Sequence, residues 1–252
     1  MINAANGKEI YYQMKSPFVR GLLDGVPIAL GYLSVSFGFG ILAVRSGLTL
    51  LTSVIISAVN LTSAGQAAGI AIIAAGGSYI EMALTQLVIN LRYGLMSISL
   101  SQKLDSTFNT PRRLLVAYGI TDEIFAVASA HNGLLTARYM YGLISISTMG
   151  WCMGTFLGAS AGQLLPASLT NAMGIVLYAM FIAIVIPPAK KSRGVLAVAV
   201  SAGLCSMVFK YLLPQVTGGF AIIISAVAAA VVGALVFPVE DVNDRVGEGG
   251  KA

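Results

Sequence analysis

The sequence predicts an all-α, polytopic membrane protein of about seven to eight transmembrane helices, some of them broken, since one span with its loop takes about 30 residues. Of the 252 residues, 57% are apolar and 10% are charged. The mean hydropathy of +0.85 lies far above that of soluble domains. We read the apolar runs as helices because a helix satisfies its own backbone in lipid, and the chain lacks the alternating pattern of a membrane β-barrel.

Eight apolar runs bounded by charged or turn residues are the candidate spans. They cover residues 22–43, 48–76, 79–100, 114–131, 138–161, 169–188, 194–213 and 218–237. Together they predict one transmembrane transport domain over 22–237. Residues 1–21 carry charges and no continuous apolar core, so we expect a retained cytoplasmic or interfacial segment and no cleaved signal peptide. Residues 238–252 form a polar tail.

The basic residues conflict with a simple count of crossings. Three clusters would each be cytoplasmic under the positive-inside rule. They are Lys8, Lys15 and Arg20; Lys103, Arg112 and Arg113; and Lys190, Lys191 and Arg193. Three runs separate each cluster from the next, which would place neighbouring clusters on opposite sides. Either the run 48–76 is a broken helix that does not cross once, or two three-helix units form an inverted repeat; both arrangements are typical of transporters.

A polar stretch interrupts the run 48–76. It contains Asn60, Thr62, Ser63, Gly65 and Gln66, and each apolar half is shorter than a span. Irregular backbone at this depth is tolerated only where it lines a cavity or is buried in protein. The interruption therefore predicts a binding site near Gln66, with hydrogen bonding between helices as the alternative.

Charged residues occur inside apolar runs at two further places. On insertion scales, a charged side chain at the centre of a membrane helix costs about 2.5 to 3.5 kcal/mol of insertion free energy. Asp122 and Glu123 would point about 100° apart on a helix, so both face one ligand only if the helix opens, for example at Gly119. One carboxylate is predicted to carry a proton or bind an amine. The alternative is that these acids lie at the water-exposed N-terminus of a helix, where they stabilise its dipole.

Arg92, in the run that also holds Asn90, has two interpretations. Its guanidinium could bind a substrate carboxylate, or it could pair with Asp122 or Glu123 and merely fix the bundle. The predicted substrate-binding or proton-coupling residues are Gln66, Asn90, Arg92, Asp122 and Glu123. Glu81, close to a loop, is expected to be solvated.

Glycines recur at every fourth position through the run 138–161 and just beyond it. Gly150, Gly154, Gly158 and Gly162 predict a flat stripe for close helix packing, against a partner in this chain or in another subunit. In the first span, Pro27 with Gly31, Gly38 and Gly40 predicts a bendable helix.

Other functional classes have little support. No basic face remains for nucleic acid once the runs are placed in lipid. A membrane-embedded enzyme needs a nucleophile with its base or a metal set, and His131, Cys152 and Cys205 supply neither. We expect no cofactor, metal site or disulfide. A scaffold subunit would have no reason to carry buried acids.

Four segments resemble the AzlC-type family, the large subunit of bacterial branched-chain amino acid exporters. They are YGITDEIFAVA at 118–128, NLRYGLMSISL at 90–100, SAGQ at 63–66 and the glycine-rich stretch 27–47. The resemblance runs from about Pro27 to Pro187. It implies a multi-pass protein of the bacterial inner membrane that exports valine, leucine, isoleucine and methionine with a small AzlD-type membrane subunit, driven by protons.

The family motifs fall on the five polar residues that the lipid argument isolates. Tyr93 and Ala67 stand where the family often has His and Phe, which bears on the substrate. Our hypothesis is that a zwitterion binds near Gln66, its carboxylate on Arg92 or helix N-terminal amides and its amine on Asp122 or Glu123. The alternative is an exporter or passive channel for another small polar solute.

Overall fold

The computed structural model describes residues 15–162, 182 and 185–237, and this part of the chain is α-helical apart from one isolated bridge between Leu104 and Leu135. Four of its helices are long and apolar enough to cross a membrane. They are α2 (Pro17–Arg45), α8 (Ala137–Ala161), α10 (Arg193–Leu212) and α11 (Gly218–Val236). The all-α prediction is confirmed, and the predicted bounds of the last three hold to within about two residues.

The chain divides into two compact units, each described separately. Unit 1 contains residues 15–76 and 89–162, and unit 2 contains 77–88 and the described residues from 182 onward. Helix α5 (Tyr79–Ser101) contributes to both. The predicted N-terminal segment and C-terminal tail lie mostly outside the described residues, as does most of the predicted span 169–188.

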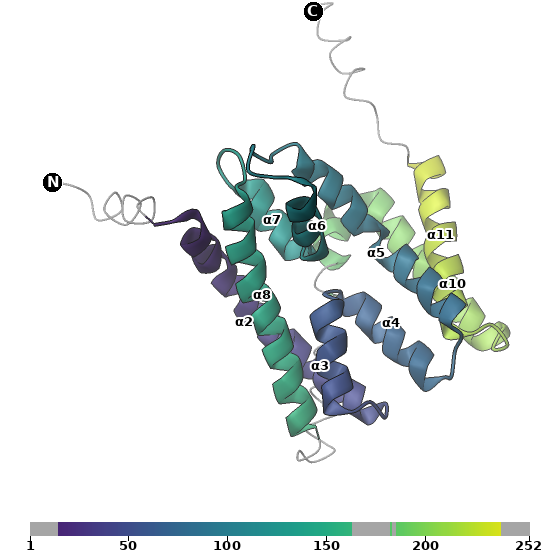
Figure 1. The fold of residues 1–252 in the computed structure, drawn as a ribbon. Coiled ribbons are helices and arrows are strands. Elements are labelled where there is room, and N and C mark those ends of the chain that lie inside the picture. The colour runs from purple at the N-terminus through teal and green to yellow at the C-terminus, as the bar shows by residue number, and fades with distance from the viewer. Residues whose placement is uncertain (1–14, 163–181, 183–184, 238–252) are drawn as a thin grey trace, which may run out of the picture. The chain divides into compact units, whose positions relative to one another are not determined.

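Helices α2 and α8 form the frame of unit 1. The glycine stripe of α8 packs on α2 of the same chain, which identifies its partner (Figure 1). Gly150 lies against the backbone of Ala29, and Gly158 lies against that of Phe37. Contact positions advance together along both helices, so the helices run parallel. Small residues permit this approach because no side chain separates the two backbones.

The predicted break in the run 48–76 is confirmed. Helix α3 (Leu50–Val59) ends at Asn60, and α4 (Ser63–Ala74) begins after Thr62, whose hydroxyl accepts a hydrogen bond from the Gly65 amide. Helices of 10 and 12 residues reach about 15 to 18 Å, roughly half of the hydrocarbon core. Ile70 of α4 packs with Ala43 and Leu48, so the α3–α4 hairpin returns to the end where it starts.

The run 114–131 is not one span, and that prediction was wrong. It belongs to two nine-residue helices, α6 (Thr110–Tyr118) and α7 (Asp122–Ala130). Helix α6 ends at Gly119, where a Cβ would overlap Ile144. Thr121 then caps α7 by accepting from the Ile124 amide. Local capping outweighs the continuous apolarity of the run.

The α6–α7 hairpin also returns to its starting end. Lys103 Nζ, just before it, donates to the carbonyls of Ser129 and His131, just after it, each at 2.8 Å. Thr107 accepts from the amide of Ala137, the first residue of α8. This is the end opposite to the α3–α4 hairpin, so the two hairpins enter unit 1 from opposite ends of the α2–α8 pair (Figure 1).

The half-length hairpin offers a solution to the conflict between charge and crossing number for the first two basic clusters. Between these clusters lie α2, a hairpin that returns to the end where it starts, and the 23-residue α5. We propose that α5 crosses the membrane as α2 does, which gives two crossings and places both clusters on one side. We therefore predict that Lys15→Cys and Gln102→Cys react with an impermeant maleimide from the same side, and Ala75→Cys from the other, in a background without the free thiols Cys152 and Cys205. Labelling of positions 15 and 102 from opposite sides would contradict the topology.

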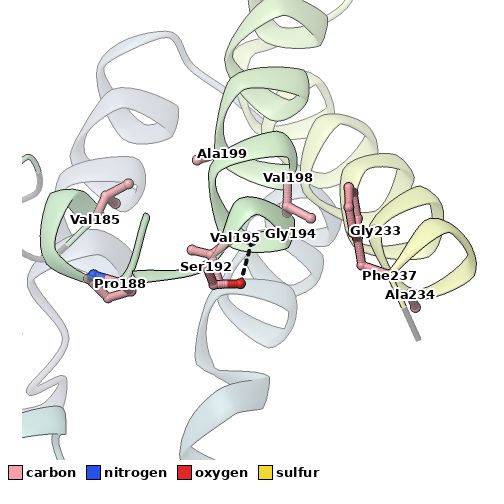
Figure 2. A pocket seen from close by; sticks show the side chains of 10 residues that line it. All are labelled: Val185, Pro188, Ser192, Gly194, Val195, Val198, Ala199, Gly233, Ala234 and Phe237. Atoms are coloured by element: carbon pink, nitrogen blue, oxygen red, sulfur yellow. Dashed lines mark hydrogen bonds between the residues drawn. The ribbon is translucent and has the colours of Figure 1, made fainter. Parts of the chain in front are cut away.

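In unit 2, α10 and α11 pack as antiparallel neighbours. Gly194 lies against Phe237 and Gly233 against Val198, so contact positions rise on one helix as they fall on the other. A cavity of about 520 Å³ lies beside this pair, and its lining is largely apolar (Figure 2). Val185 and Pro188 complete its wall.

Glu81 is buried, which corrects the prediction that it is solvated. Only 2% of this residue is exposed. Its Oε1 accepts hydrogen bonds from the Gly219 amide at 2.9 Å and from the Thr217 hydroxyl. Thr217 makes no side-chain cap on its own helix, so the carboxylate of Glu81 satisfies the first turn of α11 in its place.

We expect Glu81→Ala to loosen the start of α11 by about 2 to 3 kcal/mol, because hydrogen bonds to a charged group are lost. Hydrogen exchange in a peptide spanning 217–224 should rise accordingly. Ile80→Ala, at a neighbouring exposed position, is the control and should leave that exchange unchanged. Equal exchange in both variants would show that Glu81 does not hold this helix end.

Candidate functional site

A cavity of about 190 Å³ lies where the tips of the two hairpins meet α5. Its polar lining residues are Asn60, Thr62, Asn90, Tyr93 and Tyr118, and its apolar ones are Val59, Leu61, Ala117 and Ile120. The Tyr118 hydroxyl donates to the carbonyl of Ala58, which joins the two tips directly. Two helix breaks and the polar middle of α5 therefore border one small, partly open pocket of mixed polar and apolar lining.

Gln66 stabilises the break between α3 and α4 by hydrogen bonds to the end of α3. Its Nε2 donates to the Asn60 carbonyl at 2.7 Å and to Ser57 Oγ at 3.3 Å. Ser57 in turn lies 2.7 Å from Thr155 Oγ1, which connects the break to α8. Gln66 is 2% exposed, and within the described part of the chain its Oε1 has no hydrogen-bond partner. Gln66 thus fixes the irregular backbone that lines the cavity.

Arg92 and Asp122 form an ion pair. The distance from Arg92 Nη1 to Asp122 Oδ2 is 2.9 Å, and the side chains are 38% and 30% exposed. Arg92 Nη2 also donates to the Tyr93 hydroxyl at 3.1 Å. The structure agrees with the second interpretation of Arg92, in which the guanidinium pairs with a carboxylate of the protein. The same guanidinium orients Tyr93, which lines the cavity.

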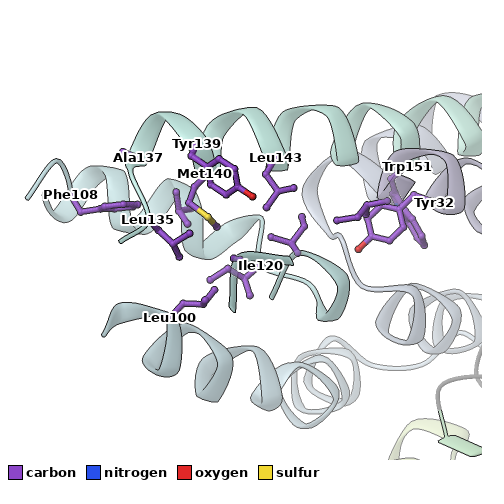
Figure 3. Packing of buried hydrophobic residues seen from close by; sticks show 14 residues of the cluster. Tyr32, Leu100, Phe108, Ile120, Leu135, Ala137, Tyr139, Met140, Leu143 and Trp151 are labelled. Carbon is purple, nitrogen blue, oxygen red and sulfur yellow. The ribbon is translucent and has the colours of Figure 1, made fainter. Parts of the chain in front are cut away.

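Glu123 points to a different partner, as the angle between adjacent helical residues requires. The Tyr32 hydroxyl of α2 lies 2.6 Å from Glu123 Oε2 and 2.5 Å from Thr121 Oγ1. Tyr32 is 7% exposed and belongs to the core of unit 1, where its ring meets Trp151 edge-on (Figure 3). The two acids therefore connect α7 to two separate elements, α5 and α2.

The five predicted residues are distributed around the cavity in different ways. Asn90 lines it, Gln66 holds one tip, and Arg92, Asp122 and Glu123 anchor the other hairpin without being lining residues. Sequence reasoning missed Tyr32, because a phenol in an apolar run is typical of a core residue. It also gave no role to Tyr118, although the motif that carries the family resemblance begins there.

The match to a known family decides what kind of protein this is. The model of the family described as AzlC protein matches residues 27–165, more than half of the chain and both broken helices. The chain belongs to the AzlC family. The match begins at Pro27, as the resemblance in the sequence predicted, and it covers the residues of the cavity.

Relatives of this AzlC family member are named as membrane proteins. The inner membrane protein YgaZ of Escherichia coli is 31% identical over 78% of this chain and 83% of its own length. An uncharacterized membrane protein of Archaeoglobus fulgidus is 32% identical over 77% of this chain and 85% of its own. A Helicobacter pylori relative is 26% identical over 69% and 78%. No solved structure matches. Family and relatives point to a membrane transporter.

Proposed function

We propose that this AzlC family protein exports branched-chain amino acids (valine, leucine and isoleucine, with methionine as a further substrate) across the bacterial inner membrane. Export is driven by protons and requires a small AzlD-type membrane subunit. The observation that carries the proposal is the pocket bordered by two helix breaks, since transporters bind small solutes where discontinuous helices meet at mid-membrane.

The size and lining of the cavity support an amino acid as substrate. A volume of about 190 Å³ lies below the range of about 300 to 1,000 Å³ of drug-sized pockets, so it suits one small molecule. Asn90, Thr62 and two phenols offer hydrogen bonds, while Leu61 and Ile120 offer apolar contact to an aliphatic side chain.

The helix ends at the cavity supply charge without a free ion. Helix α4 begins after Thr62, and its N-terminal amides suit a substrate carboxylate. Helix α3 ends at Asn60 and α6 at Gly119, where C-terminal carbonyls suit an ammonium group. Arg92 and Asp122 already neutralise each other. The zwitterion is therefore expected to bind chiefly through helix ends and amide or hydroxyl groups.

The test measures efflux of leucine, isoleucine, valine and methionine from dipeptide-loaded cells that contain this protein and the small subunit. We expect lower intracellular levels than in cells without them, with a dependence on the proton gradient. Asn90→Leu should reduce the initial efflux rate at least tenfold by removing the amide from the cavity. Leu95→Ala, exposed on the same helix, is the control.

Two results would contradict this proposal. If none of the four amino acids is lowered although both proteins are present in the membrane, the substrate class is wrong. If efflux occurs only down the concentration gradient and ignores protons, the protein is a passive channel, which needs no titrating carboxylate.

A further inference from the structure

We propose that Glu123, held by Tyr32 and Thr121, is the group that binds and releases the coupling proton, whereas Asp122 is held by Arg92. This assignment rests on proton-driven export as the function, and it identifies the residue that links the proton to the second helix break. It separates two adjacent acids that the sequence alone treats alike.

The surroundings of the two acids differ in charge. Asp122 is paired with Arg92 at 2.9 Å, and that guanidinium favours the ionised carboxylate. Glu123 has no cation within ion-pair distance in the described part of the chain. The titratable groups around it are Tyr32 from α2, Arg92 and Tyr93 from α5, and Asp122. Glu123 can therefore become neutral without leaving a positive charge unpaired.

The contacts of Tyr32 suit both protonation states of Glu123. A phenol has one proton, yet its oxygen lies within hydrogen-bond distance of both Glu123 and Thr121. With Glu123 ionised, Tyr32 donates to the carboxylate and accepts from the Thr121 hydroxyl. When a proton from water adds to a carboxylate oxygen, the new O–H donates to Tyr32, and Tyr32 donates to Thr121. Release of the proton reverses both steps and restores the charge.

A second observation is that buried polar groups close to Tyr32 in the α2–α8 pair lack a hydrogen-bond partner among the described residues. Trp151 is 3% exposed, its Nε1 has no hydrogen-bond partner among the described residues, and its ring meets that of Tyr32 with centroids 5.1 Å apart (Figure 3). Ser36, one turn further along α2, is fully buried with an unpartnered hydroxyl. Buried polar groups are almost always satisfied, and ordered water commonly does this.

The protonation state of Glu123 is transmitted to the cavity through Thr121. This residue caps α7, and Ile120 next to it lines the cavity. When Tyr32 changes from accepting from Thr121 to donating to it, the Thr121 oxygen still accepts from the Ile124 amide, and the Thr121 proton must rotate to another acceptor at the tip of the hairpin. Protonation of Glu123 thereby changes the hydrogen bonds at the tip of the α6–α7 hairpin. Thr121 and Ile120 connect the proton-binding group to the cavity.

The only tryptophan of the chain provides a test that needs no substrate. Trp151 touches Tyr32, so we expect its fluorescence in the purified protein to change with pH in a single step. Glu123→Gln should abolish the step. Tyr32→Phe should move its midpoint upward by about one pH unit or more, because the ionised carboxylate loses a donor. Asp122→Asn and the loop control Asp105→Asn should retain the step.

Transport then separates this assignment from the proposed function. In proteoliposomes with the small subunit, Glu123→Gln should lose proton-driven leucine accumulation at least tenfold, and its ratio of accumulation to exchange should fall below that of the parent. Thr121→Ser should behave as the parent and Thr121→Val should not. A retained fluorescence step, or retained accumulation, in Glu123→Gln overturns the assignment. A parent that titrates at Trp151 but exchanges no leucine overturns the proposed function and leaves Glu123 as a proton-binding group.

Discussion

Gly158→Leu is expected to prevent unit 1 from folding. A Cβ at this position would already overlap the backbone of Phe37, and leucine adds three further carbons. The parallel helices α2 and α8 would have to separate along their length, which removes the packing on which helix association in lipid depends. We expect a loss of more than about 3 kcal/mol, a large fraction of the total stability.

The measurement is the fraction of solubilised protein that elutes as a single sharp peak in size-exclusion chromatography. Gly31→Leu is the matched control, because nothing lies within 4 Å of a Cβ built there, although Gly31 is on the same helix pair. It should elute as the parent does. Normal elution of Gly158→Leu would mean that the glycine stripe does not set the distance between α2 and α8.

Neutralising Arg92 or Asp122 alone is expected to damage the protein more than neutralising both. Each of Arg92→Gln and Asp122→Asn leaves one charge without its partner, whereas the double variant leaves two amides. The side chains are about one third exposed, so we expect a coupling of about 1 to 3 kcal/mol, between the values for surface and buried pairs. Leucine transport should fall at least tenfold in each single variant and recover partly in the double one.

A double-mutant cycle of thermal stability in detergent measures this coupling directly. If the stability losses of the single variants add to that of the double variant, the two groups do not stabilise each other, and Arg92 is free for substrate. If the double variant is as stable as the parent but transports nothing, the pair acts in transport beyond holding α5 to α7.

Local sequence signals predicted much of the fold. Apolar runs between charges placed α8, α10 and α11 closely, and the polar stretch from Asn60 to Gln66 predicted the first break. The second break was only the alternative interpretation, in which Asp122 and Glu123 begin a helix, because Gly119 and Thr121 alone interrupt an otherwise apolar run. Glu81 was misjudged because its nearness to a loop is visible in sequence, whereas the helix end that it caps lies more than 130 residues away.

The sequence by itself determined that this is a helical membrane protein of the AzlC family, and it isolated the polar residues that lipid would not tolerate without a reason. The pairing of those residues became visible only in the folded chain: Arg92 with Asp122, Glu123 with Tyr32, and Gln66 with the backbone of Asn60. Hydropathy records how each segment partitions between water and lipid. Pairing depends on which segments come into contact, and Tyr32 and Glu123 meet across 91 positions of chain.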